Sequence, residues 1–189
     1  MLKHIKPAFL LLLFMTVLIG VLYPLTVTGI AQLIFPKQAN GSLLIENDKV
    51  QGSELIGQAF TKPEYFWSRP SATAPFPYNA KASNGSNVAL MNPAFLDAIK
   101  SRMAVLNAAD SKNETAIPID LLTASGSGLD PHISIAAANY QVQRVAKARH
   151  LKAETVQALV KQYTEYQTSS VLGSAGVNVL RLNLALDTH

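Results

Sequence analysis

The sequence predicts an α+β protein: a single N-terminal transmembrane helix followed by one exported mixed α/β domain. Three observations point to this fold class. No charged side chain occurs between Lys6 and Lys37, apolar residues recur at helical spacing from Phe95 onward, and shorter apolar runs are bounded by turn signals such as Asn40-Gly41. We expect residues 1–36 to form a cytoplasmic stub and membrane anchor, and residues 37–189 to form the domain.

Composition excludes several classes of protein. With 49% hydrophobic and 15% charged residues, the 189-residue chain is not disordered. Its formal net charge of +4 is too small to indicate nucleic acid as a partner. The chain has no cysteine, its four histidines lack metal-ligand spacing, and neither a phosphate-binding loop nor a serine-hydrolase elbow occurs. We therefore expect no catalytic residue and no metal site.

The uncharged N-terminal run predicts a retained membrane anchor. A membrane-spanning helix needs about 20 apolar residues, and a helix that is apolar on every face does not suit a soluble protein. A signal peptide cleaved near Ala31 is the alternative, but the apolar run continues through Ile34. Thr16 and Gly20 form a small-xxx-small pair that allows a partner helix to pack closely, and Pro24 is expected to kink or end the first helical stretch.

The charges that flank this run predict its orientation. Lys3, His4 and Lys6 precede it, whereas only Lys37 follows it closely. Cytoplasmic flanks of membrane helices are enriched in Lys and Arg. We therefore expect the N-terminus in the cytoplasm and residues 37–189 on the opposite side of the membrane.

Beyond the anchor the sequence predicts mixed secondary structure. Residues 61–93 are rich in proline and aromatic side chains, so we expect either a loop packed by its own aromatics or a docking surface with Trp67 and Arg69 as anchors. Asn92-Pro93 is a typical helix start. The expected strands are 42–46, 50–60 (with Leu55 and Ile56 buried) and 117–122; the expected helices are 93–109, 134–150 and 153–166; residues 177–186 fit both types.

A loop of small residues, Ser125-Gly126-Ser127-Gly128, precedes the helix expected at 134. Such a loop can expose backbone amides to an anion, or it can be a plain connection braced by Asp130. Taken alone, the residues favour an accessory or assembly subunit over an enzyme. Two alternatives stay open: a free-standing, membrane-tethered periplasmic binding or sensor domain, and a tethered hydrolase that uses Ser125 or Ser127.

Short sequence blocks along almost the whole chain resemble the small C subunit of the Kdp-type potassium-transporting P-type ATPase. Each block is modest by itself, but their order and coverage make the resemblance specific. The blocks include YPL at 23–25, QANGSL at 38–43, RPSATA at 69–74, LTAS at 122–125, GLD at 128–130, RVAKAR at 144–149 and LNLALD at 182–187.

The resemblance implies a role in a bacterial inner-membrane complex that takes up potassium at the expense of ATP. The implied partners are a channel-like potassium-binding subunit, a P-type ATPase catalytic subunit and a very small membrane peptide. In the resembled family this subunit is described as a catalytic chaperone that raises the ATPase subunit's affinity for ATP. The positions that match the implied ATP contact are Ser125, Gly126, Ser127, Gly128 and Gln141.

That ATP contact conflicts with the orientation expected from the flanking charges. ATP and the nucleotide domain of a P-type ATPase are cytoplasmic, whereas the charge bias exports residues 37–189. The orientation instead favours a lid on the outer face of the potassium-binding subunit, which stabilises the complex or shapes ion entry.

Overall fold

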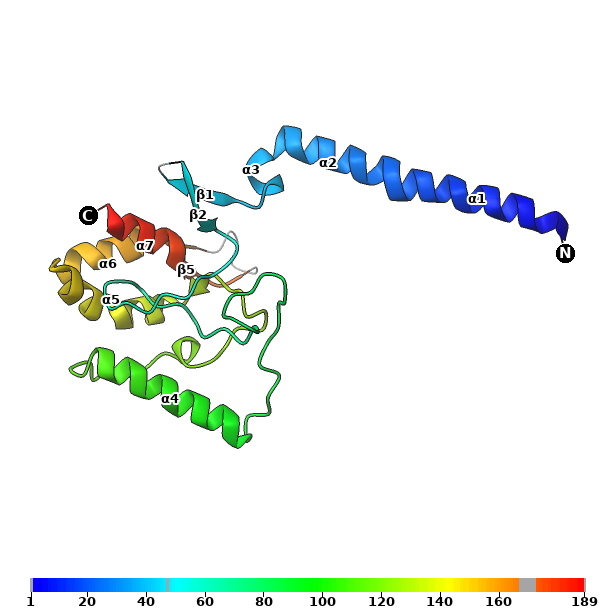
Figure 1. Ribbon diagram of the computed structural model, residues 1–189. Coiled ribbons are helices and arrows are strands. Elements are labelled where there is room, and N and C mark those ends of the chain that lie inside the picture. Colours follow the sequence, from blue (N-terminus) through cyan, green and yellow to red (C-terminus); the bar gives the residue numbers. More distant parts are fainter. Residues whose placement is uncertain (1, 47, 167–172, 189) are drawn as a thin grey trace. The chain divides into compact units, whose positions relative to one another are not determined.

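A computed structural model describes residues 2–46, 48–166 and 173–188 (Figure 1). The chain forms two compact units, Met1–Gln51 and Gly52–His189. The first unit holds a long apolar helix, and the second is a mixed domain of helices and short strands. The predicted α+β class with one long N-terminal apolar helix is therefore confirmed.

The long helix is continuous from Ile5 to Ile34, 30 residues. It follows a 3₁₀ turn, η1 (Leu2–His4), and consists of α1 (Ile5–Val17), a π-helical turn η2 (Leu18–Leu22) and α2 (Tyr23–Ile34). At 1.5 Å per residue its length is about 45 Å, more than the roughly 30 Å of a bilayer's hydrocarbon core.

Pro24 was expected to kink or end the first helical stretch, and it does not end the helix. A proline inside a helix lacks an amide donor and its ring crowds the carbonyl four residues earlier. Here the preceding turn widens, so that the amide of Tyr23 bonds to the carbonyl of Leu18, five residues back. The wider π-helical turn accommodates the proline, and the helix continues.

The long helix is followed by a helical turn, α3 (Pro36–Ala39), and a two-stranded sheet of β1 (Leu43–Glu46) and β2 (Lys49–Ser53), whose last two residues belong to the second unit. The first predicted strand is confirmed. The second is much shorter than predicted, because the chain leaves the sheet after Ser53. Leu55 is 62% exposed and Ile56 is only partly buried, so their predicted burial was wrong.

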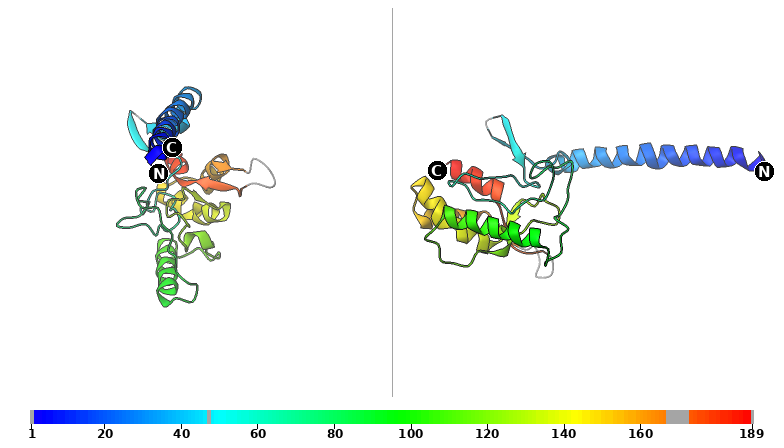
Figure 2. Two further views of the ribbon diagram at one scale, coloured as in Figure 1. Left: turned by 90° about the vertical axis from the view of Figure 1, so that its right-hand side faces the viewer. Right: turned by 60° about the horizontal axis from the view of Figure 1, so that its bottom comes forward.

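In the second unit, α5 (Ile135–Arg149), α6 (Ala153–Gln162) and α7 (Val179–Asp187) gather around the core, with α4 (Pro93–Ala109) at the edge (Figures 1 and 2). Phe66 and Trp67, from the irregular segment before α4, are buried in the same core. The aromatic residues of that segment therefore pack the fold, although Phe76 is 56% exposed. Of α4 only Leu106 is buried.

Helices α4 and α5 begin where the sequence predicted, and each start has a side-chain cap, of which only Asn92 was predicted. The Asn92 side chain accepts the amide of Ala94 at the start of α4, and the Ser134 side chain accepts that of Ala137 at the start of α5. Helix α5 ends at His150, whose left-handed backbone lets the Leu151 amide bond to a carbonyl of the last turn. Helix α6 ends at Gln162, earlier than predicted, because the chain turns into a strand.

A small antiparallel sheet has the order β3-β5-β4 and consists of β3 (His132–Ile133), β4 (Thr164–Glu165) and β5 (Gly176–Asn178). His132 pairs with Asn178, and Thr164 pairs with Val177. Residues 177–186, which fitted both types, are strand β5 followed at once by α7, whose start is capped by the Asn178 side chain. The predicted strand at 117–122 was wrong: it is a 3₁₀ turn, η3 (Ile119–Leu121).

Candidate functional site

The loop of residues 125–128 is closely packed against the segments before α4. Its Ser127 carbonyl accepts hydrogen bonds from the Asn84 amide and the Ser83 hydroxyl, both at 3.0 Å. The Gly128 carbonyl accepts one from the Ser71 hydroxyl at 2.7 Å. The loop is thus a surface connection that is hydrogen-bonded to residues between 71 and 84. Gly126 and Ser127 are exposed, whereas Ser125 is buried.

Gly128 is required by this packing. Its φ of +68° lies in the left-handed region, and a Cβ there would come within 2.6 Å of the Asn84 carbonyl oxygen and 2.7 Å of the Thr73 methyl group. Gly126, in contrast, has open space around it. Close packing therefore explains the glycine at position 128 but not the glycine at position 126.

Gln141 lies elsewhere, in the core, and is 1% exposed. Its Nε2 donates to the carbonyls of Trp67 and Ala137, at 3.1 and 3.2 Å. Its Oε1 accepts from the Trp67 amide at 2.7 Å and from the Arg144 guanidinium at 2.6 Å. Because both amide protons and both oxygen lone pairs have partners within the chain, the hydrogen-bonding capacity of Gln141 is filled.

Asn183 on α7 forms the equivalent pair of hydrogen bonds with Phe66, the residue before Trp67. Its Oδ1 accepts the Phe66 amide at 2.9 Å, and its Nδ2 donates to the Phe66 carbonyl at 3.0 Å. The two side-chain amides therefore pair with two successive backbone units in the way that a neighbouring strand would.

The same stretch of backbone is held by two arginines of α5. Arg144 donates to the carbonyls of Pro63 and Tyr65, and Arg149 donates to that of Glu64. The Arg144 guanidinium also lies 4.3 Å from the centre of the Trp67 ring. Burial lowers the pKa of Arg144 to about 10, so this side chain stays charged at neutral pH and each of its contacts is a charge-assisted one.

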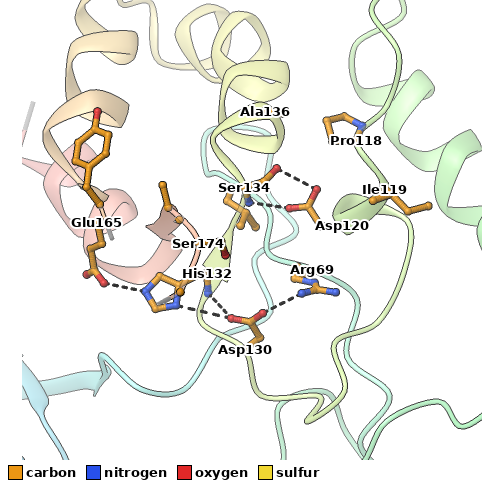
Figure 3. A pocket seen from close by; sticks show the side chains of 15 residues that line it. Arg69, Pro118, Ile119, Asp120, Asp130, His132, Ser134, Ala136, Glu165 and Ser174 are labelled. Atoms are coloured by element: carbon orange, nitrogen blue, oxygen red, sulfur yellow. Dashed lines mark hydrogen bonds and ion pairs between the residues drawn. The ribbon is translucent and has the colours of Figure 1, made fainter. Parts of the chain in front are cut away.

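A second polar cluster lines an open cavity of about 730 Å³ beside the small sheet (Figure 3). In Figure 3 the Asp130 carboxylate lies between Arg69 and His132, and Glu165 lies on the other side of the imidazole. Asp130 pairs with Arg69 at 3.0 Å, and His132 Nε2 lies 3.1 Å from Glu165, which also pairs with Arg181 of α7 at 3.1 Å. Asp130 braces its loop, as the simpler sequence interpretation expected.

Charge within this cluster shifts two pKa values. The neighbouring Asp130 carboxylate, at 3.8 Å from Nδ1, is the main cause of the raised pKa of His132; burial opposes it, and Glu165 adds to it. Burial works against the charge on Asp130, but the contacts with His132 and Arg69 outweigh it and lower the pKa of that carboxyl. The cluster therefore favours an imidazolium held between two carboxylates.

The anchor residues picked from the sequence lie on the long helix. The Thr16 hydroxyl donates to the Leu12 carbonyl at 2.8 Å, within the helix. A side chain added at Gly20 would find its nearest neighbour, the Thr16 methyl group, at 3.9 Å, and one added at Gly29 would find none within 4 Å. The helix itself thus needs neither glycine, and packing of a partner helix at Thr16 and Gly20 stays a prediction.

Sequence reasoning missed the cluster around His132. Asp130 and His132 are close in sequence, but Arg69 and Glu165 come from distant segments, so spacing carried no signal. Asn183 did carry a signal, because it stands at helical spacing among the leucines of α7, and a polar side chain on an apolar face indicates a buried hydrogen bond. Among the residues that the structure describes, no group of three His, Cys, Asp or Glu side chains could hold a metal ion.

The described residues thus combine one helix that is long and apolar enough to cross a membrane with a small α+β domain. The profile of the family described as "K+-transporting ATPase, c chain" (KdpC) matches residues 5–188. The chain belongs to this family.

Curated relatives agree over the full length. The "Potassium-transporting ATPase KdpC subunit" of Methylococcus capsulatus is 59% identical over 187 residues, which cover 99% of this chain and 98% of the relative. The protein of the same description from Polaromonas naphthalenivorans is 58% identical, with 97% and 93% covered. That from Serratia proteamaculans is 55% identical, with 98% of each chain covered.

Replacing Gln141 with Leu is predicted to destabilise the second unit by about 2–4 kcal/mol, because the amide and carbonyl of Trp67 lose their partners in a buried site. Urea unfolding of the full chain in detergent, followed by Trp67 fluorescence, measures this. Gln143→Leu is the matched control, since Gln143 lies on the same helix but is exposed, and it should change the free energy of unfolding by at most about 0.5 kcal/mol. Wild-type stability of Gln141→Leu would refute this structural role for Gln141.

The raised pKa of His132 predicts a pH-dependent stability. Its contribution is fully present below the pKa of an unfolded histidine, about 6.5, and is lost as the pH rises through the higher folded value. Because these groups are partly exposed, we expect at most about 1 kcal/mol. The free energy of unfolding should fall more steeply between pH 6 and about pH 8 for the natural chain than for His132→Gln.

The lowered pKa of Asp130 acts in the other direction: its contribution is present above about pH 4 and is lost as the pH falls through the depressed value. The cluster is therefore most stabilising in mildly acidic solution. Parallel stability curves for the natural chain and His132→Gln would refute this account.

Proposed function

We propose that this chain is a non-catalytic accessory subunit of an ATP-driven potassium uptake complex in a bacterial inner membrane, needed for assembly and activity. The observation that carries the proposal is the match to the C-chain family over residues 5–188, which includes both the long helix and the domain. The buried amides of Gln141 and Asn183 support the non-catalytic part of the proposal, because both are hydrogen-bonded to the backbone of Phe66 and Trp67 and stabilise the fold.

We infer that the N-terminus is cytoplasmic and that the domain lies in the periplasm. Lys3, His4 and Lys6 at one end of the helix, against Lys37 at the other, support this orientation. The expected partners are a channel-like potassium-binding subunit, a P-type ATPase catalytic subunit and a very small membrane peptide. The domain would cover the outer face of the potassium-binding subunit.

In this orientation a catalytic chaperone raises the ATPase subunit's affinity for ATP without touching the nucleotide. The filled hydrogen-bonding capacity of Gln141 supports an indirect effect. The Gly128 amide, a donor that a phosphate would need, is likewise used within the chain, because it donates to the Ser125 carbonyl at 3.3 Å. Direct ATP contact through Ser125, Gly126, Ser127, Gly128 and Gln141 would require the domain in the cytoplasm and a rearranged Gln141.

The small-xxx-small pair predicts how the anchor contributes to assembly. Membranes that contain the other pump subunits but lack this chain should lose potassium-stimulated ATP hydrolysis, and the chain should restore it. Gly20→Leu should lower the amount of chain that co-purifies with the complex several-fold, because it fills the groove offered to a partner helix. Gly29→Leu is the matched control, because that glycine has equally open space within the helix.

Equal co-purification of the two glycine variants would remove Gly20 from the interface. A complex that assembles and pumps normally without this chain would refute the accessory role and favour the free-standing binding or sensor domain.

Orientation is testable because the chain has no cysteine. A membrane-impermeant maleimide added to intact spheroplasts should label Ser111→Cys, which is exposed in the domain, and should not label His4→Cys, exposed at the start of the long helix. The reverse pattern would place the domain in the cytoplasm and would revive direct nucleotide contact.

A further inference from the structure

The sheet formed by β1 and β2 presents apolar side chains to solvent. Leu43 is 43% exposed, Ile45 65% and Val50 60%. Side chains of a strand alternate between its faces, so Leu43 and Ile45 lie on one face of β1, whereas Leu44 and Glu46 on the other face are partly buried. An exposed, apolar sheet face of this kind in a small unit indicates an interaction surface.

The position of this sheet in the chain indicates what covers it. Helix α2 ends at Ile34 and β1 begins at Leu43. The connection contains the helical turn α3, and even a fully extended chain gains only about 3.5 Å per residue. The strand therefore starts within roughly 30 Å of the end of the membrane helix, so the short connection keeps it near the bilayer surface.

Charges along the same segment suit a phospholipid surface. Lys37 in α3, which follows the membrane helix, is an exposed cation, and phospholipid headgroups carry phosphate. Glu46, Asp48 and Lys49 lie together around the turn between the strands, where two carboxylates outnumber one cation. This distribution favours a sheet that lies along the membrane, with its net acidic turn toward water.

We propose that the exposed apolar face of β1 and β2, with Leu43, Ile45 and Val50, rests in the interfacial layer of the lipid bilayer. The occupant of this face is phospholipid rather than protein. The contact continues the lipid contact of the long helix and fixes the point at which the chain leaves the membrane. The proposal rests on the membrane anchor but not on the side of the membrane that the domain occupies.

The test uses the full chain in vesicles of phosphatidylethanolamine and phosphatidylglycerol, with an environment-sensitive fluorophore on single cysteines. Ile45→Cys and Val50→Cys should be quenched by nitroxide-labelled phospholipid several-fold more strongly than Gln51→Cys. Gln51 is the matched control, because it is exposed and adjacent to Val50 on the same strand. Ile34→Cys, at the end of the membrane helix, supplies the reference for a lipid-quenched site.

Two results would overturn the proposal. Weak quenching and water-like emission at 45, 50 and 51, with Ile34→Cys still quenched, would place the sheet in water while leaving the anchor intact. Blue-shifted emission at 45 and 50 without lipid quenching would show that protein covers this face. Loss of quenching at Ile34→Cys as well would refute the anchor and with it the proposed function.

Discussion

The backbone of residues 63–67 belongs to no strand, yet it enters the core of the second unit and links α5 to α7 through hydrogen bonds to its polar groups. Each carbonyl from Pro63 to Trp67 accepts a hydrogen bond from a side chain of one of these helices. An unsatisfied buried peptide group costs about 1–3 kcal/mol. The helix positions that face this segment therefore need side chains that can donate hydrogen bonds. Two of these side chains are amides and two are guanidinium groups: Gln141, Asn183, Arg144 and Arg149.

This constraint changes how Gln141 is understood. The family resemblance implied an ATP contact for Gln141, and nothing in the sequence indicated its actual partner, because Trp67 lies 74 positions away along the chain. In the folded chain the Gln141 side chain forms the two hydrogen bonds with Trp67 that a neighbouring strand would otherwise form. Arg144, in the RVAKAR block that resembles the potassium-pump subunit, also bonds to this backbone. The similarity of that block therefore has a structural explanation that does not require a nucleotide.

Local signals predicted the helices better than the strands. Caps at Asn92 and Ser134 fixed two helix starts, since a cap acts within three residues of itself. The strands β3, β4 and β5 are two or three residues long, which is too short for an alternating pattern to be visible. Their pairing, and the cluster of His132 with Glu165, arises only when α6 returns the chain to the sheet.

The proposed action from the periplasmic side of the membrane is compatible with an effect on ATP, because binding equilibria are linked. Suppose that the pump with ATP bound holds this subunit more tightly than the empty pump does, by some factor. The subunit must then raise the pump's affinity for ATP by the same factor, wherever the two sites are. Couplings of about 1–3 kcal/mol, or 5- to 150-fold, are typical. What such a subunit needs is a rigid body held firmly to its partner, and the side-chain bonds that fix residues 63–67 between α5 and α7 supply that rigidity.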